Sequence, residues 1–411
     1  MNHSLNELDP ISQPQPPTKY RRLWLAAVLG LLTAFGPFSI DMYLPSLPAL
    51  TIDLHTNTSL AQLSLTACLL GLAFGQLFAG PISDKRGRKK PLVIALIIYA
   101  AASLLCAVCP SIWLLIVLRI IQGIAGSAGI VISRAMVSDL YSGTELTKFY
   151  SLLMMINGIA PIIAPIIGGQ LLRVTSWHGV FVVLCLISVL LLVSVIFGLP
   201  ETLSYENRSN DDIKATLSTF GRLITDRVFM GYTLSQGLVM AAMFAYISGS
   251  PFVLQNIYDV SPQAFSIFFA VNGLGIIIAT QITGRLAGRV SEKKVLVMGL
   301  ALAGFASVAL LITILTGASM VAVVVSLFVV VSCVGIVTTV GFSLAMQNQS
   351  RSAGSASALL GLLPFIAGAI VAPLVGIAGS HTAMPMGIII FITDVGSIVC
   401  FAILTRRRMT N

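Results

Sequence analysis

Charged residues are scarce in this chain. Only 9% of its 411 residues are Asp, Glu, Lys or Arg, whereas soluble globular domains carry roughly 25%. Hydrophobic residues make up 56% of the chain, and the mean hydropathy is +0.96. Because so few charges cannot cover a water-soluble surface, the composition excludes a soluble enzyme and a secreted domain.

Catalytic and metal-binding patterns are also missing from the sequence. It contains no Walker loop, no metal-ligand cluster and no catalytic triad, so we expect no catalytic residue, no metal site and no cofactor. Cys106 and Cys109 form a C-x-x-C, but no histidine or second cysteine pair lies near them. The net charge of +9 does not indicate a nucleic-acid partner, because the basic residues lie at the ends of apolar runs.

Long apolar runs dominate the rest of the chain. Each is long enough for a helix to cross about 30 Å of hydrocarbon, and the runs are continuous rather than alternating, which favours helices over barrel strands. The sequence therefore predicts an all-α membrane protein with twelve transmembrane helices. The runs lie at residues 23–44, 60–82, 91–109, 112–133, 149–171, 178–198, 229–254, 263–284, 294–316, 319–345, 355–379 and 384–404.

The cations predict how these helices cross the membrane. With the N-terminus in the cytoplasm, 22 of the 24 Lys and Arg lie in cytoplasmic segments, which is the expected bias. Both termini are therefore predicted to be cytoplasmic. The predicted parts are a tail at 1–22, a six-helix half at 23–198, a linker at 199–227, a second half at 228–404 and a tail at 405–411.

An internal repeat relates the two halves. The loop Gly80–Lys90 and the loop Gly284–Lys294 share their first glycine and final two lysines at an offset of 204 residues. Gly158-x-x-Pro161 recurs in the second half at an offset of 203. Two pseudo-symmetric halves in the same orientation indicate a parallel repeat, with a site between them near the membrane midplane.

Five motifs then indicate a family. On these motifs the chain resembles the major facilitator superfamily, within it the twelve-span drug:proton antiporters, and most of all the Bcr/CflA bicyclomycin/chloramphenicol resistance subfamily. The motif of the first loop has Lys85 and Arg86 where the family has R-x, and the motif of span 5 has Ala164 in place of a glycine. The motifs are D-M-Y-L-P at 41–45, G-P-I-S-D-K-R-G-R-K at 80–89, L-R-I-I-Q-G-I-A-G at 118–126, A-P-I-I-A-P-I-I-G-G at 160–169 and L-P-E-T-L at 199–203.

The resemblance implies a function and its partners. It implies export of hydrophobic drug-like compounds across the bacterial inner membrane by alternating access, with the proton gradient as the energy source. Drugs, protons and membrane lipid would be the partners of a monomer. One alternative is a proton-coupled uptake symporter for a small metabolite on the same fold, against which the span 5 motif argues. The other is an intramembrane enzyme, which the lack of paired acid/base or metal residues disfavours.

Three charged residues lie within predicted spans, namely Asp41, Arg119 and Asp394. Such residues are costly in a bilayer and are functional candidates. Arg119 lies about 10 Å from the outer start of its span, a depth compatible with that of Asp41. Asp41 and Arg119 form either a static ion pair or part of the proton-coupling machinery, as the resemblance implies for Arg119. In the second case the proton affinity of Asp41 is set by its burial and by this cation. For Asp394 we favour a structural hydrogen bond over a coupling role.

The loop after the second span carries a second group of candidates. The resemblance implies that it forms a conformational latch, in which Asp84 and Arg88 hold span 2 to span 11 in the outward-facing state. The alternative is a basic loop that only sets topology. The breaks at Gly80–Pro81 and Gly87 predict a tight turn. The latch residues are Gly80, Asp84, Arg86, Gly87 and Arg88.

Span 5 and the presumed pocket complete the predictions. Pro161, Pro165, Gly168 and Gly169 bend span 5 and allow close helix contact. The motif is either a packing kink or, by resemblance, the antiporter motif that seals the cytoplasmic-side interface. Methionine, aromatic and midspan amide side chains suit a pocket for several substrates, although each could instead be core or pair between helices. The candidates are Phe38, Asn157, Met243, Tyr246 and Asn272.

Overall fold

A computed structural model describes residues 19–208, 221–347, 349 and 353–405 of the chain, and within these ranges every regular element is a helix. Residues 1–18, 209–220 and 406–411, which hold most of the two predicted tails and part of the predicted linker, lie outside the described residues.

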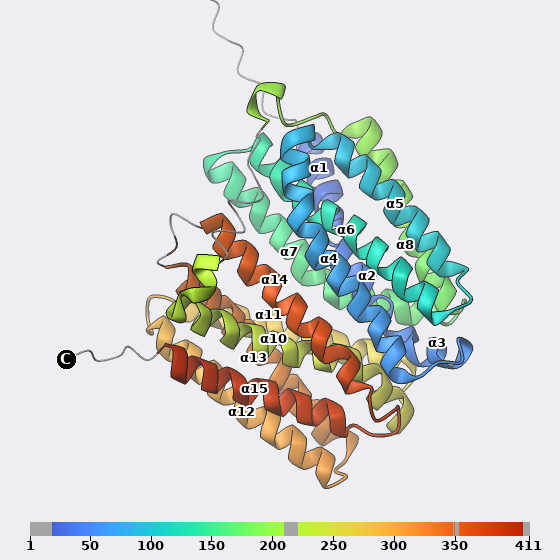
Figure 1. The fold of residues 1–411 in the computed structure, drawn as a ribbon, viewed down its shortest axis with the longest axis vertical. Coiled ribbons are helices and arrows are strands. Elements are labelled where there is room, and N and C mark those ends of the chain that lie inside the picture. The colour runs from blue at the N-terminus through green and yellow to red at the C-terminus, as the bar shows by residue number, and fades with distance from the viewer. Residues whose placement is uncertain (1–18, 209–220, 348, 350–352, 406–411) are drawn as a thin grey trace, which may run out of the picture.

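The helices form two bundles that follow each other along the chain (Figure 1). The first bundle, blue to green, consists of α1 (Lys19–Thr33), α2 (Phe35–Asp41), η1 (Leu44–Ser46), α3 (Leu47–Asp53), α4 (Thr58–Arg86), α5 (Lys89–Ala107), α6 (Ile112–Leu140), α7 (Gly143–Leu171) and α8 (Trp177–Gly198). The second consists of α10 (Arg227–Phe252), η3 (Val253–Ile257), α11 (Pro262–Leu286), α12 (Glu292–Leu315), α13 (Met320–Met346), α14 (Ala353–Val375) and α15 (Met384–Leu404).

Each of the twelve predicted apolar runs coincides with a helix or a helix pair, so the predicted all-α membrane architecture is confirmed. Among the described residues, ten helices are long and apolar enough to cross a membrane, and a bent pair adds an eleventh. The eleventh predicted run corresponds to α14, whose apolar part Leu359–Val375 is shorter. The bent pair is the first run, which breaks by 45° after Thr33. Pro37 explains the break, because it cannot donate to the carbonyl four residues earlier.

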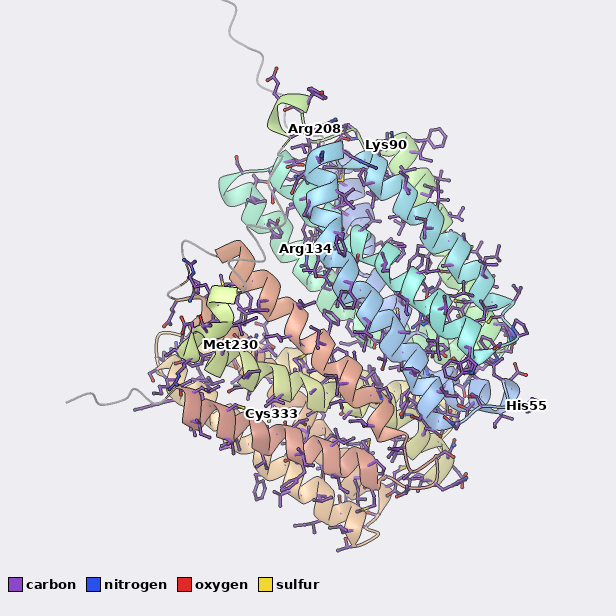
Figure 2. The ribbon with its side chains drawn as sticks, in the orientation of Figure 1. His55, Lys90, Arg134, Arg208, Met230 and Cys333 are labelled. Carbon is purple, nitrogen blue, oxygen red and sulfur yellow. The ribbon has the colours of Figure 1, made fainter. Side chains whose placement is uncertain are left out.

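The two ends of the molecule differ in charge. We call the end where α4 passes into α5 and α11 into α12 the basic end, because Lys85–Lys90 and Arg285–Lys294 lie there. The opposite end, which carries α3 and the start of α4, is the distal end. Lys90 and His55 mark the two ends of the first bundle in Figure 2.

The tightest helix contact in the first bundle is that of α4 with α6. A Cβ on Gly71 would lie 3.0 Å from the Cα of Gly123, and one on Gly123 would lie 2.9 Å from the backbone nitrogen of Leu72. The two backbones therefore touch directly, as small residues permit in membrane helices. This contact fixes α6, which carries both Arg119 and Arg134, against α4.

Gly123→Leu is therefore expected to destabilise the protein strongly, because the added side chain must push two backbones apart. Overpacking of this kind costs about 1–3 kcal/mol or more. A thermal unfolding measurement in detergent should show a clear fall in the midpoint. Gly284→Ala is the matched control, since a Cβ there meets nothing within 4 Å, and alanine is favoured over glycine in a helix by about 0.5–1 kcal/mol. Equal stability of the two variants would contradict the backbone contact.

The two repeated loops share a glycine turn but differ in how the helix that follows is capped. Both pass through a glycine in the left-handed region, with φ of +85° at Gly87 and +78° at Gly288. The backbone thus aligns Gly288 with Gly87 in conformation, although the sequence offset aligns it with Asp84. The helix that follows Gly288 is capped by the Ser291 hydroxyl, which accepts from the Lys294 N–H at 3.3 Å. The predicted break at Gly80–Pro81 is wrong, because α4 continues to Arg86 through an internal proline.

Candidate functional site

A cavity of about 380 Å³ lies between the two bundles. Residues from α1, α2, α4, α6 and α7 line one side, and residues from α10, α11 and α14 line the other, so the cavity belongs to both halves, as the repeat predicts. We call it the central cavity. It is lined by Thr33, Gly36, Pro37, Ile40, Asp41, Leu72, Gln76, Ile130, Arg134, Asn157, Pro161, Met243, Phe244, Ile247, Phe269, Gly361 and Phe365.

Asp41 is the acid of this cavity. It is the last residue of α2, is only 6% exposed, and lines the cavity wall among apolar side chains. Among the described residues, no hydrogen bond or ion pair is formed by its carboxylate. A buried carboxylate without a hydrogen-bond partner is stabilised when it binds a proton or a cationic ligand.

The cation of the central cavity is Arg134, which sequence reasoning missed. We predicted Arg134 to lie in a cytoplasmic loop, but α6 continues six residues beyond it to Leu140, and Arg134 lines the cavity. Its Nε atom is buried and has no hydrogen-bond partner in the described part of the chain. Arg134 is labelled in Figure 2. The sequence does contain a sign that the helix continues past Arg134. The apolar residues Met136 and Val137 follow within one turn, and both are buried.

Arg119 lies outside the central cavity, inside the first bundle. Its side chain is fully buried and donates from Nη1 to the Gln122 side chain at 2.6 Å and from Nη2 to the Ser39 carbonyl at 2.7 Å. The guanidinium also lies 4.9 Å from the ring centre of Tyr43 and 5.6 Å from that of Phe181. A charge-assisted network and two aromatic faces therefore hold this cation, rather than a carboxylate.

The expected proximity of Asp41 and Arg119 is wrong in this structure, for a simple geometric reason. Arg119 binds the backbone at Ser39, which is two residues before Asp41 on the same helix. Residues at i and i+2 of an α-helix do not face each other. The Ser39 side chain faces the interior of the first bundle, where its hydroxyl lies 2.6 Å from the Tyr99 hydroxyl, whereas Asp41 lines the central cavity, so Arg119 and Asp41 lie on different sides of α2.

Some of the predicted pocket residues line the central cavity, and others lie behind those that do. Asn157 and Met243 line the central cavity, and the Asn157 side chain donates to the Leu153 carbonyl at 3.3 Å. Asn272 and Tyr246 lie behind the wall, where the Asn272 amide donates to the Tyr246 hydroxyl at 2.7 Å. The ring of Tyr246 stacks on the wall residue Phe269 with centroids 5.4 Å apart. Phe38 is buried and does not line the cavity.

The proline and glycine motif of α7 lies where three segments meet. A Cβ on Gly168 would collide with the backbone of Met42, directly after Asp41, and one on Gly169 would lie 3.0 Å from the Pro262 carbonyl of α11. The two glycines thus let α7 touch both its own half and the other half. We expected this seal on the cytoplasmic side, at the basic end. That location is wrong for the glycines, because α7 ends at Leu171 and its last turn lies at the distal end. Pro161 lines the central cavity, and Pro165, like Pro161, lies inside the helix.

Hydrogen bonds between the two bundles cluster at the distal end. In the part of the chain that the structure describes, all four side-chain hydrogen bonds that cross the boundary lie there. The protein is therefore closed at its distal end, with the central cavity on the basic side of this closure. The bonds run from Ser59 to Pro373 O at 2.9 Å, from Gln62 to Ser248 O at 3.0 Å, from Gln255 to Pro45 O at 3.2 Å and from Gln263 to Gly169 O at 2.7 Å.

The predicted latch forms a different set of bonds. Arg88 donates from Nε to Asp139 at 2.9 Å, from Nη1 to the Ser83 hydroxyl at 2.8 Å, and also from Nη1 to Asp84. Burial alone would disfavour the cation, but the bonds to Asp139 and Asp84 outweigh it and raise the pKa of Arg88. Asp139 lies in the last turn of α6, so this group joins α4 to α6 within the first bundle. Among the α14 side chains that the structure describes, none bonds to it.

Glu201 completes this cluster at the basic end. Its carboxylate accepts from the backbone N–H groups of Arg88 at 2.7 Å and of Lys89 at 3.1 Å, and it thereby caps the start of α5. Gly87 must be glycine here, because its φ is positive and a Cβ would press against Glu201. Sequence reasoning missed Asp139 and Glu201, although Glu201 lies in the L-P-E-T-L motif. Among the described residues, no bond joins the Arg86 side chain to this cluster, and Gly80 meets it only through its carbonyl, which accepts from the Ser83 hydroxyl.

Asp394 is the second buried acid. It lies on α15, is fully buried, and neither of its carboxyl oxygens has a hydrogen-bond partner among the residues that the structure describes. The structural hydrogen bond that we favoured for it is therefore wrong in this structure. Asp394 does not line the central cavity.

Comparison with known proteins places this arrangement in a family. The sequence model described as Major Facilitator Superfamily matches residues 29–373. The MFS-type transporter YdgK of Bacillus subtilis is 47% identical over 96% of this chain and 98% of its own. A bicyclomycin resistance protein homolog of Haemophilus influenzae is 31% identical over 93% and 96%.

A solved structure has the same fold. The xylose transporter XylE from E. coli, in a partially occluded inward open conformation, superposes with a TM-score of 0.71 at 14% identity over 96% of this chain and 100% of that one. The two halves, the cavity between them and these matches lead to one conclusion: the chain is a multi-pass membrane protein that belongs to the major facilitator superfamily of transporters.

Proposed function

We propose that this protein exports hydrophobic drug-like molecules across the bacterial inner membrane in exchange for protons. The observation that carries the proposal is Asp41, a carboxylate without a partner among the described residues, in the wall of an apolar cavity between the halves. A proton and a cationic drug would compete for such a group. That competition is what exchange requires.

The wall chemistry supports a broad substrate range. Met243, Phe244, Ile247, Phe269 and Phe365 give the cavity soft and aromatic surfaces that can repack around different molecules. The similarity to a bicyclomycin resistance protein homolog points in the same direction. We place the basic end in the cytoplasm on the cation bias of the sequence, so that a drug would enter the central cavity from the cytoplasm.

The proposed cycle begins in the state described above. A drug occupies the central cavity beside ionised Asp41, the four distal hydrogen bonds between the halves break, and the basic end closes. In that outward-facing state Asp84 and Arg88 would latch α4 to α14, a role that stays a prediction here. A proton from outside then neutralises Asp41 and releases the drug. For a neutral drug, one proton moving inward across 100 mV gains about 2.3 kcal/mol, which exceeds the about 1.4 kcal/mol that a tenfold drug gradient needs. Exchange of one proton for a monovalent cationic drug moves no net charge, so the pH gradient alone drives that exchange.

Transport by everted membrane vesicles tests this proposal. Vesicles from a pump-deficient bacterial host that expresses the protein should accumulate a hydrophobic fluorescent drug when respiration acidifies their lumen. An uncoupler should abolish the accumulation, and vesicles without the protein are the control. Proton-driven accumulation of a metabolite in right-side-out vesicles, without drug movement, would favour the uptake symporter instead. Accumulation that the uncoupler leaves unchanged would contradict proton coupling.

A further inference from the structure

A second cavity, of about 410 Å³, opens on the outer face of the first bundle between α4, α5 and α6. It shares no lining residue with the central cavity. We call it the outer groove. Its lining is formed by Gly75, Phe78, Ala79, Ile82, Arg86, Lys90, Pro91, Ile94, Ala95, Ile98, Ile121, Ile124, Ala125, Ala128 and Ile132.

Most of the outer groove is apolar and faces the lipid. Its rims carry large side chains that are about half exposed, such as Phe78, Ile94 and Ile124. Its floor is made by small residues, among them Ala95 and Ala125, which are buried. Small floor residues between large rim residues produce a depression along the helices. From Gly75 to Arg86 the groove follows α4 for about 16 Å at 1.5 Å per residue, close to the roughly 15 Å that one leaflet of a 30 Å hydrocarbon core provides.

Two cations lie at the mouth of the groove, at the basic end. Arg86 is the last residue of α4 and Lys90 is the second residue of α5, and both are exposed. Among the described residues, neither forms an ion pair or a side-chain hydrogen bond. Two acids of this end of the first bundle are engaged with other groups, since Asp84 binds Arg88 and Glu201 caps α5. The mouth therefore carries two uncompensated positive charges at the height where lipid headgroups lie.

We propose that the outer groove binds an anionic phospholipid, with one acyl chain along the apolar floor and the phosphate between Arg86 and Lys90. Basic pockets between transmembrane helices bind anionic headgroups in this way. A zwitterionic headgroup fits less well, because its own ammonium group would approach the same two cations. The lipid would bind on the face of the protein that the transport cycle described above does not use.

Native mass spectrometry of the detergent-purified protein tests the headgroup part. With equal amounts of phosphatidylglycerol and phosphatidylcholine added, we expect at least about fivefold more bound phosphatidylglycerol, given the ~1 kcal/mol that each basic residue near an anionic surface contributes. Arg86→Gln with Lys90→Gln should remove that preference, and Lys90→Gln alone should weaken it. Lys85→Gln is the matched control, because Lys85 is an exposed cation at the same helix end that does not line the groove.

A second pair of variants tests whether an acyl chain lies along the floor of the outer groove. Ala95→Phe fills the floor and should lower phosphatidylglycerol binding with both cations intact. Ile97→Phe, on the exposed side of the same helix and outside the groove, should leave it unchanged. A thermal unfolding measurement shows whether each variant is folded. If the double variant is not folded, the single variants are used for the test instead. Three results would each overturn the proposal. The first is equal binding of the two lipids, and the second is an equal loss of phosphatidylglycerol binding in Lys85→Gln and in the double variant. The third is displacement of the bound phosphatidylglycerol by millimolar inorganic phosphate.

Discussion

Replacing Asp41 by Asn is expected to abolish transport driven by a pH gradient. In proteoliposomes the rate of drug export against an imposed gradient should fall by about tenfold or more, since intramembrane acids of this kind are functional residues. The side chain keeps its size and polarity but can no longer exchange a proton. Binding of neutral drugs, measured by tryptophan or ligand fluorescence, should remain and should no longer depend on pH.

The control for this variant is another acid at the distal end. Asp53 lies outside the central cavity and accepts a hydrogen bond from the Trp177 indole at 2.8 Å. Asp53→Asn removes the same charge and keeps an acceptor oxygen, so transport should be close to normal. Loss of transport in both variants, or retention in both, would contradict a special role for Asp41.

Replacing Arg119 should separate transport from stability. Arg119→Lys keeps a buried charge but cannot reach both Gln122 and the Ser39 carbonyl, and each lost hydrogen bond to a charged group costs about 1.5–3 kcal/mol. Arg119→Met removes the charge and its burial cost, but it leaves the buried Gln122 side-chain oxygen and Ser39 carbonyl without their donor, at about 1–3 kcal/mol each. We therefore expect both variants to be less stable than the wild type, and both to lose most of their transport.

This comparison decides between the two interpretations of Arg119. If the cation only holds the first bundle together, Arg119→Met should unfold at a lower temperature and should transport normally per folded molecule. If it serves proton coupling, the folded Met variant should be inactive. Thermal unfolding in detergent and drug export in proteoliposomes, measured on the same preparations, give both answers.

The fold could be predicted from the sequence because its main determinant is local. A run of about 20 apolar residues specifies a membrane helix by itself, and every predicted run coincides with a helix. The exceptions have local causes as well. The first run breaks near Pro37, and α6 extends past Arg134 because the apolar face resumes at Met136.

The site was predicted less completely, because its contacts join residues that are distant in the chain. Asp41 could be found as an acid in an apolar run, but the direction of its side chain depends on which face of α2 meets α6. Arg88 meets Asp139 and Glu201 only after three segments have packed together. No residue spacing in the sequence predicts such a contact between distant segments. Arg119 could be found as a cation within an apolar run, whereas its partners Gln122 and the Ser39 carbonyl were not predicted.

Proton release on drug binding tests the central claim most directly. A cationic drug is added to detergent-purified protein in weak buffer, and the pH change is followed with an indicator dye, in wild type and in Asp41→Asn. If proton and drug compete at Asp41, the wild type releases protons on drug addition and the variant releases none. Undiminished release from Asp41→Asn would contradict the account and would move the coupling site elsewhere, with the buried and unpartnered Asp394 as the next candidate.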